Sequence, residues 1–574
     1  MTTSKSIVNL SMRVLARLKE YGAGLSPTGL VLTLTFLCAS MAPSLIPREW
    51  FFQGLLSGLS MVAGYAMGAL LGATVRWLGF TCPWSAKVTR ILWRIFAGVT
   101  LIAIPLFTIL GAQWQTELRL LFGMEADGPA RVFSQLVLGI LIAVGLLALG
   151  RSIRTLTLWV TQKLDRWIPR RAAILAAIII VSWVLVTLIN GTLVQGTANV
   201  LNNLYEASDK GYPENREQPQ LPERSGSPQS LSHWDSLGFQ GRTFVTDNPS
   251  LEEIQEFADQ APALNGVEPK TPIRVYAGLS EDESLHKTAK QVVAELDRTN
   301  AWDRSVLMVA TATGTGWIDP SFTATFELMH AGDTAIATMQ YSYLPSWVSF
   351  LSDRSTPPAA GRALFEAVYE AWLEKPEDSR PELYVYGLSL GSYGMQGAFS
   401  GLQDMTERTD GALFVGTPSF TPNWQYFTEH RDPGSLEIAP VFDGGHRVRF
   451  SAEPNAASNL VENTENWQAP RVAYLQHASD GVIWWSPDLI FTAPDWLNEP
   501  AGVDRRVNMV WLPSVTFWQV TFDMFVSGNV PSGHGHAYHL EYTDALAALT
   551  APDGWSQEDS ALLMDNMSNR PVIN

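Results

Sequence analysis

The sequence predicts two parts: an N-terminal all-α transmembrane helical domain and a C-terminal α/β domain with a mostly parallel sheet and helices on both faces. Three observations support this division. The first third contains five long apolar stretches, and the second half alternates strand-like with helix-like segments. Residues 1–196 carry a net charge of +11, whereas the remainder carries −28. The expected boundaries are 1–196 for the membrane part, 197–250 for a linker and 251–574 for the α/β domain.

Composition excludes several classes of protein. Charged residues make up 17% of the 574 residues, which is low for a soluble protein. The two cysteines, Cys38 and Cys82, exclude a disulfide framework and a multi-cysteine zinc site. An acidic second half argues against nucleic acid as a partner, since a nucleic-acid groove needs a basic surface. No cofactor and no metal are expected.

The five apolar stretches are each long enough to cross a bilayer, which takes about 20 residues. They lie near residues 29–46, 51–75, 91–110, 132–149 and 172–194. The second is rich in Gly, Ala and Ser, a composition that permits close packing of helices in lipid. Because the stretches carry few ionisable residues, they are interpreted as an anchor rather than a transport pathway.

Basic residues near these stretches predict the orientation. They gather before the first stretch and in the second-to-third and fourth-to-fifth loops: Lys5, Arg13, Arg17, Lys19, Arg76, Lys87, Arg90, Arg151, Arg154, Lys163, Arg166, Arg170 and Arg171. The positive-inside rule then places the N-terminus in the cytoplasm, and five crossings place the chain after about residue 196 outside it. The first stretch lacks a small-residue cleavage site, so it is expected to be retained.

The second half begins with a polar segment rich in Pro, Ser and Gly at 208–250, which predicts a linker or a segment lying on the surface. Strands are expected at 273–279, at the start of 305–316, at 334–341, at 382–394 running into a tight turn, and at 412–418, 471–480 and 507–513; helices are expected at 283–297 and 359–373. Such alternation is typical of a parallel sheet covered on both faces.

The sequence Gly-Leu-Ser-Leu-Gly at 387–391 matches the G-x-S-x-G pattern. It follows an apolar strand and precedes small residues that can start a helix, which is the context of a nucleophile elbow. Ser389 is therefore the candidate nucleophile. A serine hydroxyl is weakly nucleophilic at neutral pH and needs a neighbouring base.

The base is expected in the glycine-rich loop at 531–539, which follows the last predicted strand. His534 and His536 are both candidates, with His536 favoured because small residues flank it and an aromatic residue follows at the second position. His534, His536 and His539 could instead hold a metal ion. No HExxH pattern is present and a metal would leave the serine turn unexplained, so metal binding is the weaker hypothesis.

The acid of the triad is expected between Ser389 and the histidines. Asp480 is preferred because it ends a predicted strand and precedes Gly481. A carboxylate there would fix the imidazole tautomer and stabilise its cation. Asp523 is the second choice and Asp443 the third.

The oxyanion hole needs backbone N–H groups directed at the developing negative charge. One donor is expected from Leu390, the residue after the nucleophile. The other is expected from the glycine-containing loop after an early strand, at Gly314, Thr315 and Gly316.

Together these motifs resemble a family of bacterial membrane-anchored α/β-hydrolases, which pair an N-terminal multi-span domain with a C-terminal hydrolase domain. The motifs that carry the resemblance are PSLIPREW, TGTGWIDP, GLSLGS, SDGVIWW and GHGHAY. The resemblance implies an exported serine-hydrolase-like domain on the inner membrane of a bacterial cell, and it supplies no substrate.

The expected activity is that of a membrane-anchored extracytoplasmic serine hydrolase, lipase-like, which cleaves an ester of a lipid or envelope component through an acyl-enzyme. Its partners would be the bilayer and an acylated lipid or small molecule. One alternative is an acyltransferase that passes the acyl group to an envelope lipid or glycan. Another is a non-catalytic membrane scaffold. Trp484 and Trp485, beside Asp480, could line the substrate cleft or simply pack in the core.

Overall fold

The computed structural model describes residues 24–80, 84–126, 130–189, 204–279, 284–462 and 464–571. The chain divides into two compact units. The first, here called the helical unit, contains the N-terminal helices together with Pro487–Ala493 and Asn508–Phe522. The second, the α/β unit, contains Val184–Ser486, Pro494–Val507 and Asp523–Asn574.

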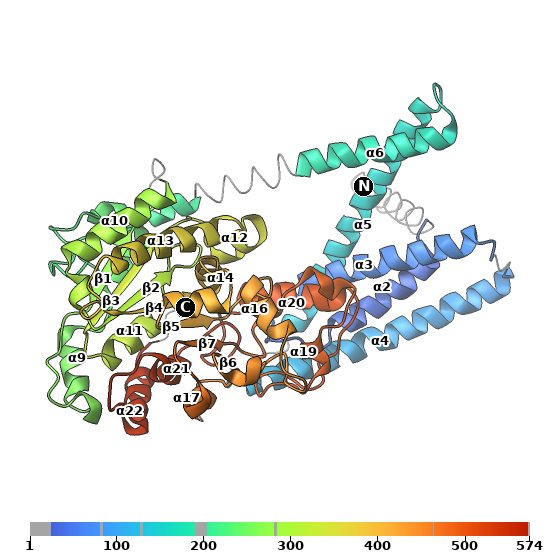
Figure 1. Cartoon of the computed structure of the whole chain (residues 1–574). Coiled ribbons are helices and arrows are strands. Elements are labelled where there is room, and N and C mark those ends of the chain that lie inside the picture. The colour runs from blue at the N-terminus through green and yellow to red at the C-terminus, as the bar shows by residue number, and fades with distance from the viewer. Residues whose placement is uncertain are drawn as a thin grey trace, which may run out of the picture. The chain divides into compact units, whose positions relative to one another are not determined.

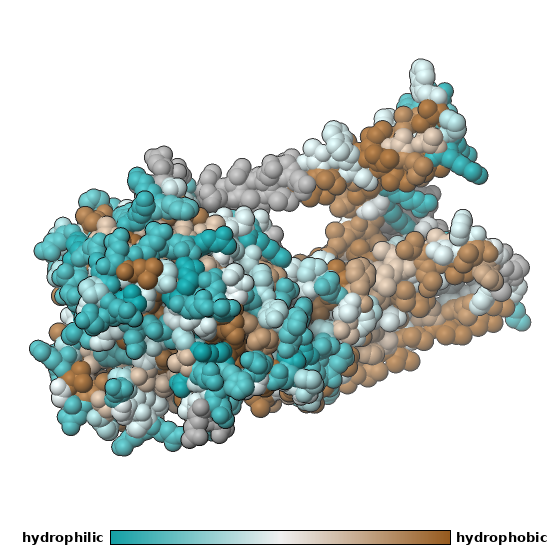
Figure 2. Space-filling model, in the orientation of Figure 1, coloured by the Kyte–Doolittle hydropathy of each residue, from teal (hydrophilic) through white to brown (hydrophobic). Residues whose placement is uncertain are grey.

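Among the residues that the structure describes, four helices are long and apolar enough to cross a membrane. They are α3 (Trp50–Trp77), α4 (Ala86–Leu121), α5 (Ala130–Leu164) and α6 (Arg170–Leu188). Large apolar side chains are exposed along all four, and Figure 2 shows these helices as predominantly hydrophobic. This is the surface that a lipid environment requires, so the four helices indicate membrane association.

The first of the five predicted membrane spans forms a shorter helix than a span requires. Within the described residues it forms α2 (Pro27–Ser40), a helix of 14 residues. Fourteen residues rise about 21 Å, short of the roughly 30 Å hydrocarbon core. Pro43 and Pro47 follow the helix, and proline lacks the N–H that an extended helix would need. The sequence remains apolar after Ser40, but helix α2 ends at that residue.

Helices α2 and α3 pack closely at glycines of the second stretch. A Cβ atom on Gly64 would lie 2.5 Å from the carbonyl oxygen of Leu32, and one on Gly68 would lie 2.4 Å from that of Thr28. The Thr28 hydroxyl donates a hydrogen bond of 2.7 Å to the Gly68 carbonyl oxygen. Glycine therefore lets the two backbones approach, as the Gly-rich composition predicted.

The α/β unit is built on a seven-stranded, fully parallel sheet (Figure 1). Its strands are β1 (Ile273–Ala277), β2 (Val306–Thr311), β3 (Thr334–Met339), β4 (Glu382–Leu388), β5 (Gly411–Val415), β6 (Val448–Ser451) and β7 (Arg471–Leu475). The spatial order is β1-β3-β2-β4-β5-β7-β6. Strands β1 to β3 lie on one side of the sheet and β4 to β7 on the other, so β2 and β4 meet at a topological switch point. Ligands bind at the carboxyl ends of the strands at such a point.

Helices cover both faces of this sheet (Figure 1). On one face lie α10 (Leu285–Arg298), α13 (Thr356–Leu373) and α14 (Leu390–Gln396); on the other lie α8 (Gly238–Thr246), α9 (Leu251–Ala258), α11 (Pro320–Met329), α21 (Glu541–Leu549) and α22 (Gln557–Ser568). Shorter helices lie in the connections: α12 (Ser346–Ser352), α15 (Leu402–Arg408), α16 (Pro422–Glu429), α17 (Ser458–Val461), α18 (Gly481–Trp484), α19 (Asp495–Asn498) and α20 (Val515–Val526). The sheet and both layers match the predicted fold class.

Two strand assignments differ from the sequence prediction. Residues 507–513 form no strand, and Asn508–Phe522 belongs to the helical unit, where Gln519 donates to the Ala42 carbonyl oxygen at 3.0 Å. The sheet edge is instead completed by β6, a strand of four residues that was not predicted. A short apolar run has the same pattern whether it enters a sheet or packs on helices, so periodicity cannot separate the two.

Residues 204–250, inside the predicted linker, pack on the α/β unit. The Ser225 N–H donates to the Arg274 carbonyl oxygen at 3.1 Å, and the hydroxyls of Ser225 and Ser230 both donate to the Glu295 carboxylate at 2.9 Å. Ser225 and Glu295 are fully buried. This segment therefore lies on the surface of the α/β unit, and its polar side chains cap that unit rather than remaining solvated.

Candidate active site

Ser389 lies in a sharp turn between β4 and α14. Its φ of 58° and ψ of −124° are unusual for a residue with a Cβ atom. The turn is tight enough that a Cβ on Gly387 would lie 2.4 Å from the Gly391 carbonyl oxygen, and one on Gly391 would lie 2.2 Å from that of Thr311. The two glycines of the G-x-S-x-G pattern are thus required by close backbone contacts. Such a strained strand-to-helix turn holds a serine above the sheet.

Asp480 follows β7 and caps the short helix α18. Its Oδ1 accepts a hydrogen bond of 2.8 Å from the Val482 N–H, and its Oδ2 accepts one of 2.9 Å from the Tyr538 hydroxyl. His536 Nδ1 lies 2.6 Å from the same Oδ2. The Asp480 side chain is completely buried, so these donors replace the water that a carboxylate would otherwise need.

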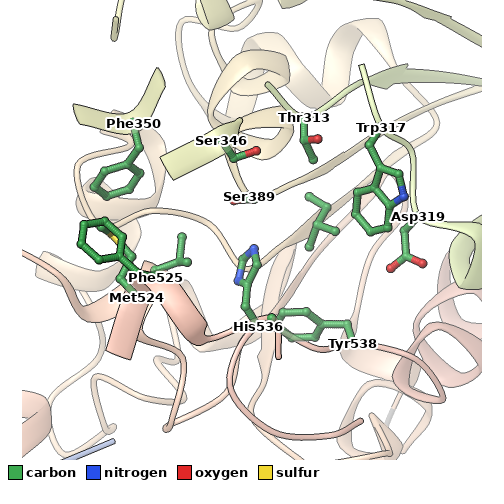
Figure 3. A pocket seen from close by; sticks show the side chains of 13 residues that line it. Thr313, Trp317, Asp319, Ser346, Phe350, Ser389, Met524, Phe525, His536 and Tyr538 are labelled. Carbon is green, nitrogen blue, oxygen red and sulfur yellow. The ribbon is translucent and has the colours of Figure 1, made fainter. Parts of the chain in front are cut away.

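His536 joins Asp480 to the cavity that contains Ser389. Because Nδ1 faces a carboxylate, the ring carries its proton there and leaves Nε2 as the basic atom. Nε2 is buried and has no hydrogen-bond partner among the described residues. Figure 3 shows the ring pointing from its loop toward Ser389, and both residues line the same cavity. A free, oriented imidazole nitrogen beside a serine is what proton abstraction requires.

Gly416, at the end of β5, makes room for this ring. A Cβ atom there would lie 2.3 Å from His536 Cε1 and 2.7 Å from Nδ1. Its φ of 54° also favours glycine. This contribution to the site was not predicted, because a glycine after a strand has no distinctive local pattern.

His534 points elsewhere, although it is two residues from His536. It does not line the cavity of Ser389, and its carbonyl oxygen accepts the Ala537 N–H at 3.1 Å. Burial lowers the pKa of its imidazole, and the charge of Asp504 opposes this shift in part. Of the two candidate bases, His536 is the one that contacts Asp480 and lines the same cavity as Ser389.

A third histidine, His477, holds the loop in place. Its Nδ1 donates to the Gly535 carbonyl oxygen and its Nε2 donates to Glu541, each at 2.9 Å, and its ring stacks on Tyr538 at 4.2 Å. Burial by itself would lower the pKa of His477, but the hydrogen bond and charge of Glu541 raise it to about 9. The residue was missed in the sequence, although it lies three residues before Asp480.

The loop predicted for the oxyanion hole lies after β2, at the switch point of the sheet. Its Gly314 N–H donates to the Ser346 hydroxyl at 3.2 Å and its Gly316 N–H donates to the Thr313 carbonyl oxygen at 2.9 Å. Thr313 and Trp317 line the cavity, whereas residues 314–316 do not. Leu390, directly after Ser389, is the first residue of α14. Thr315 binds Gln340 through its carbonyl oxygen, at 3.2 Å.

The cavity has a volume of about 220 Å³ and is mostly apolar (Figure 3). Its lining residues are Thr313, Trp317, Asp319, Ser346, Phe350, Leu388, Ser389, Val482, Met524, Phe525, Gly528, His536 and Tyr538. All belong to the α/β unit. Such a lining suits an acyl chain or another apolar group beside the serine.

Asp319 is a second buried acid at this cavity. Burial raises the pKa of its carboxyl to about 6. Its Oδ2 accepts a hydrogen bond of 2.8 Å from the Tyr542 hydroxyl, and its Oδ1 accepts one of 2.8 Å from the Ser321 N–H at the start of α11. The carboxylate is therefore used to cap that helix and to fix Tyr542.

The other sequence candidates occupy different environments. Asp443 is exposed, 4.0 Å from His446, and Asp523 is buried without lining the cavity. His539 Nε2 donates to the Met567 carbonyl oxygen at 2.9 Å, and its Nδ1 accepts from the Ser321 hydroxyl at 2.7 Å. In the part of the chain that the structure describes, no three His, Cys, Asp or Glu side chains converge as metal ligands.

The two tryptophans after Asp480 pack around the site without lining the cavity. Trp484 donates from Nε1 to the His477 carbonyl oxygen at 2.9 Å, and its ring packs 5.5 Å from that of Trp496. Trp485 packs 5.4 Å from Phe350, which does line the cavity. Both tryptophans are buried.

A parallel seven-stranded sheet with a strained serine turn, a buried His–Asp pair and a shared cavity defines the α/β-hydrolase class. Comparison with protein families agrees. Residues 273–563 match the alpha/beta-hydrolase family, and residues 41–249 match the model described as the N-terminus of that family. The chain belongs to this alpha/beta-hydrolase family. Neither the curated proteins nor the solved structures returned a match.

Proposed function

We propose that this protein is a membrane-anchored serine hydrolase that cleaves an ester of a lipid or envelope component. The observation that carries the proposal is the buried pair of His536 and Asp480, at 2.6 Å, whose free imidazole nitrogen shares a cavity with Ser389. Family membership supports a hydrolase-type function in general. The apolar lining of the cavity supports an acyl substrate.

In this mechanism Ser389 attacks the acyl carbonyl while His536 Nε2 takes the serine proton. Asp480 keeps the ring in one tautomer and stabilises the imidazolium. The Leu390 N–H, directly after Ser389, donates to the oxyanion. Collapse of the tetrahedral intermediate breaks the ester C–O bond, and His536 returns the proton to the departing alcohol. Water then attacks the acyl-enzyme by the same route and releases the acid.

The location we propose is a multi-pass membrane protein with the α/β unit outside the cytoplasm. The helix ends that flank the α3–α4 loop carry Arg76, Lys87 and Arg90. The end of α5, the loop after it and the start of α6 carry Lys163, Arg166 and Arg170. The loop between α4 and α5 is richer in acids. By the positive-inside rule the chain after α6 is then outside the cytoplasm, whether or not the short helix α2 crosses.

Reaction with a fluorophosphonate probe tests the proposed mechanism. The full-length protein in neutral detergent is expected to label at Ser389, and Ser389→Ala is expected to abolish labelling. His536→Gln should slow labelling at least about 100-fold, since it removes the base. The matched control His534→Gln should change the rate little, because that ring does not line the cavity. Absence of labelling in folded wild-type protein, or labelling that survives Ser389→Ala, would contradict the mechanism.

A further inference from the structure

One wall of the cavity is backed by an aromatic cluster formed by Phe350, Phe420 and Trp485. Phe350 lines the cavity, at the edge that Figure 3 shows opposite Trp317. Its ring lies 4.8 Å from that of Phe420 and 5.4 Å from that of Trp485, both edge-to-face. This geometry leaves ring faces available to a cation.

An exposed arginine, Arg354, covers this cluster. Its guanidinium carbon lies 4.1 Å from the ring centre of Phe420, 5.7 Å from that of Phe350 and 6.0 Å from that of Trp485. Arg354 Nε donates to the Phe350 carbonyl oxygen at 3.2 Å. The Tyr393 hydroxyl, on the helix that starts at the nucleophile, donates to the Arg354 carbonyl oxygen at 2.9 Å. The side chain of Arg354 is thus held by the aromatic rings and the Phe350 carbonyl oxygen, and its backbone is held by Tyr393.

No carboxylate lies within ion-pair distance of Arg354 among residues whose positions the structure gives. The neighbouring Asp353 instead accepts hydrogen bonds from Ser355 and from the Thr356 N–H, at 2.9–3.1 Å. The acidic excess of residues 197–574, a net charge of −28, therefore does not neutralise this guanidinium by direct ion pairing. The terminal N–H groups of Arg354 remain able to bind an anion from solution.

We propose that Arg354 binds an anionic group, phosphate or carboxylate, on the ester that enters the cavity. The inference rests on the proposed function, because it assigns the substrate class of the same site. A guanidinium matches both oxyanions in a bidentate geometry, and stacking on aromatic rings fixes its plane beforehand. The preferred substrate would then combine an apolar acyl portion with a negatively charged head group.

Protection of Ser389 from the fluorophosphonate probe tests this inference without a known substrate. The competitors are octyl phosphate, octanoate and uncharged octanol, added to the full-length protein in neutral detergent. In the wild-type protein either anion should protect at a concentration roughly threefold to tenfold lower than octanol. If octyl phosphate and octanoate differ, the stronger competitor identifies the head-group chemistry.

Substitutions at Arg354 test whether this residue causes the stronger protection by the anionic competitors. Arg354→Gln should abolish the advantage of the anions over octanol, with protection expressed relative to the labelling rate of the same variant without competitor, and Arg354→Lys should keep part of it. The matched control is Arg380→Gln, because Arg380 also stacks on an aromatic ring, 3.7 Å from Trp372, but neither residue lines the cavity. Equal protection by the three competitors in wild-type protein, or an unchanged preference in Arg354→Gln, would overturn the inference.

Failure of the proposed hydrolase mechanism would give a different result. Folded wild-type protein would then not label at all, and equilibrium binding of radiolabelled octyl phosphate to wild-type and Arg354→Gln proteins would decide the anion site instead. Weaker binding to the variant would support the site, and equal binding would overturn it.

Discussion

His534 and His536 have nearly the same local sequence, a glycine before each ring, yet the structure gives them different neighbours. Gly533 and Gly535, one directly before each histidine, both have positive φ, and Gly535 turns the backbone between the two rings. His536 reaches the buried Asp480 and the cavity, whereas His534 pairs its backbone with Ala537. Loop conformation, not residue type, distinguishes the two rings.

At the residue scale, His477 should give the folded protein a dependence on pH. Its pKa is about 9 in the folded protein and about 6.5 in an unfolded chain, and one pKa unit corresponds to about 1.4 kcal/mol, so the contribution is of the order of 3 kcal/mol. Because the folded pKa is the higher one, this stabilisation is complete below pH 6.5 and is lost as the pH rises through 9. Thermal unfolding in detergent between pH 6 and pH 9.5 measures it.

The control for this prediction is His477→Gln, which keeps a hydrogen-bond donor but does not titrate. This variant should be less stable than wild type at pH 6 and should lose the decline in stability between pH 6.5 and pH 9. A decline of equal size in both proteins would show that another group is responsible.

At the scale of elements, two glycine-dependent contacts have different purposes. In the turn from β4 to α14, Gly387 and Gly391 allow backbone segments to meet so that Ser389 is held in a strained conformation. In α3, Gly64 and Gly68 allow a second helix to approach. The first pattern is recognisable as a short motif, whereas the second shows itself as composition spread over a whole helix.

The α2–α3 contact predicts the effect of adding one methyl group. Gly68→Ala should lower the stability of the helical unit by about 1–3 kcal/mol, because the new Cβ would overlap the Thr28 carbonyl oxygen. Gly98→Ala in α4 is the matched control, since no atom lies within 4 Å of its added Cβ. It should be neutral or slightly stabilising, as alanine favours helix. Thermal unfolding in the same detergent compares them, and equal effects would contradict the packing argument.

At the scale of the whole molecule, the helical part precedes the α/β part as predicted, but no single position in the sequence separates the two units. Pro487–Ala493 and Asn508–Phe522 lie within the region that matches the hydrolase family and yet belong to the helical unit. Gln519 bonds to the backbone after α2, and the ring of Phe522 lies 6.0 Å from that of Phe52. The helical unit is thus assembled from distant parts of the chain.

Reporter fusions test the proposed topology. Alkaline phosphatase is active outside the cytoplasm and green fluorescent protein inside it, so each is fused after residue 84, between α3 and α4, and after residue 571. Phosphatase activity is expected at residue 571 and fluorescence at residue 84, because basic residues keep the α3–α4 loop in the cytoplasm. The opposite pattern would place the α/β unit in the cytoplasm.

The sequence alone determined the features that depend on local pattern. Long apolar stretches indicated membrane helices, alternating strands and helices indicated the parallel sheet, and the spacing around Ser389 indicated a nucleophile turn. These are short-range properties, since hydropathy, periodicity and the steric needs of glycine act within a few residues.

Only the tertiary structure decided which distant groups meet. It brought His536 rather than His534 to Asp480 and placed His477 behind the histidine loop. It also stacked Arg354 on the rings behind the cavity wall, with no ion pair to any carboxylate that the structure describes. It also showed that residues 507–513, predicted as a strand, lie outside the sheet. Contacts of this kind join residues that are tens to hundreds of positions apart in the sequence. They depend on packing and burial across the whole fold, so a local sequence pattern cannot predict them.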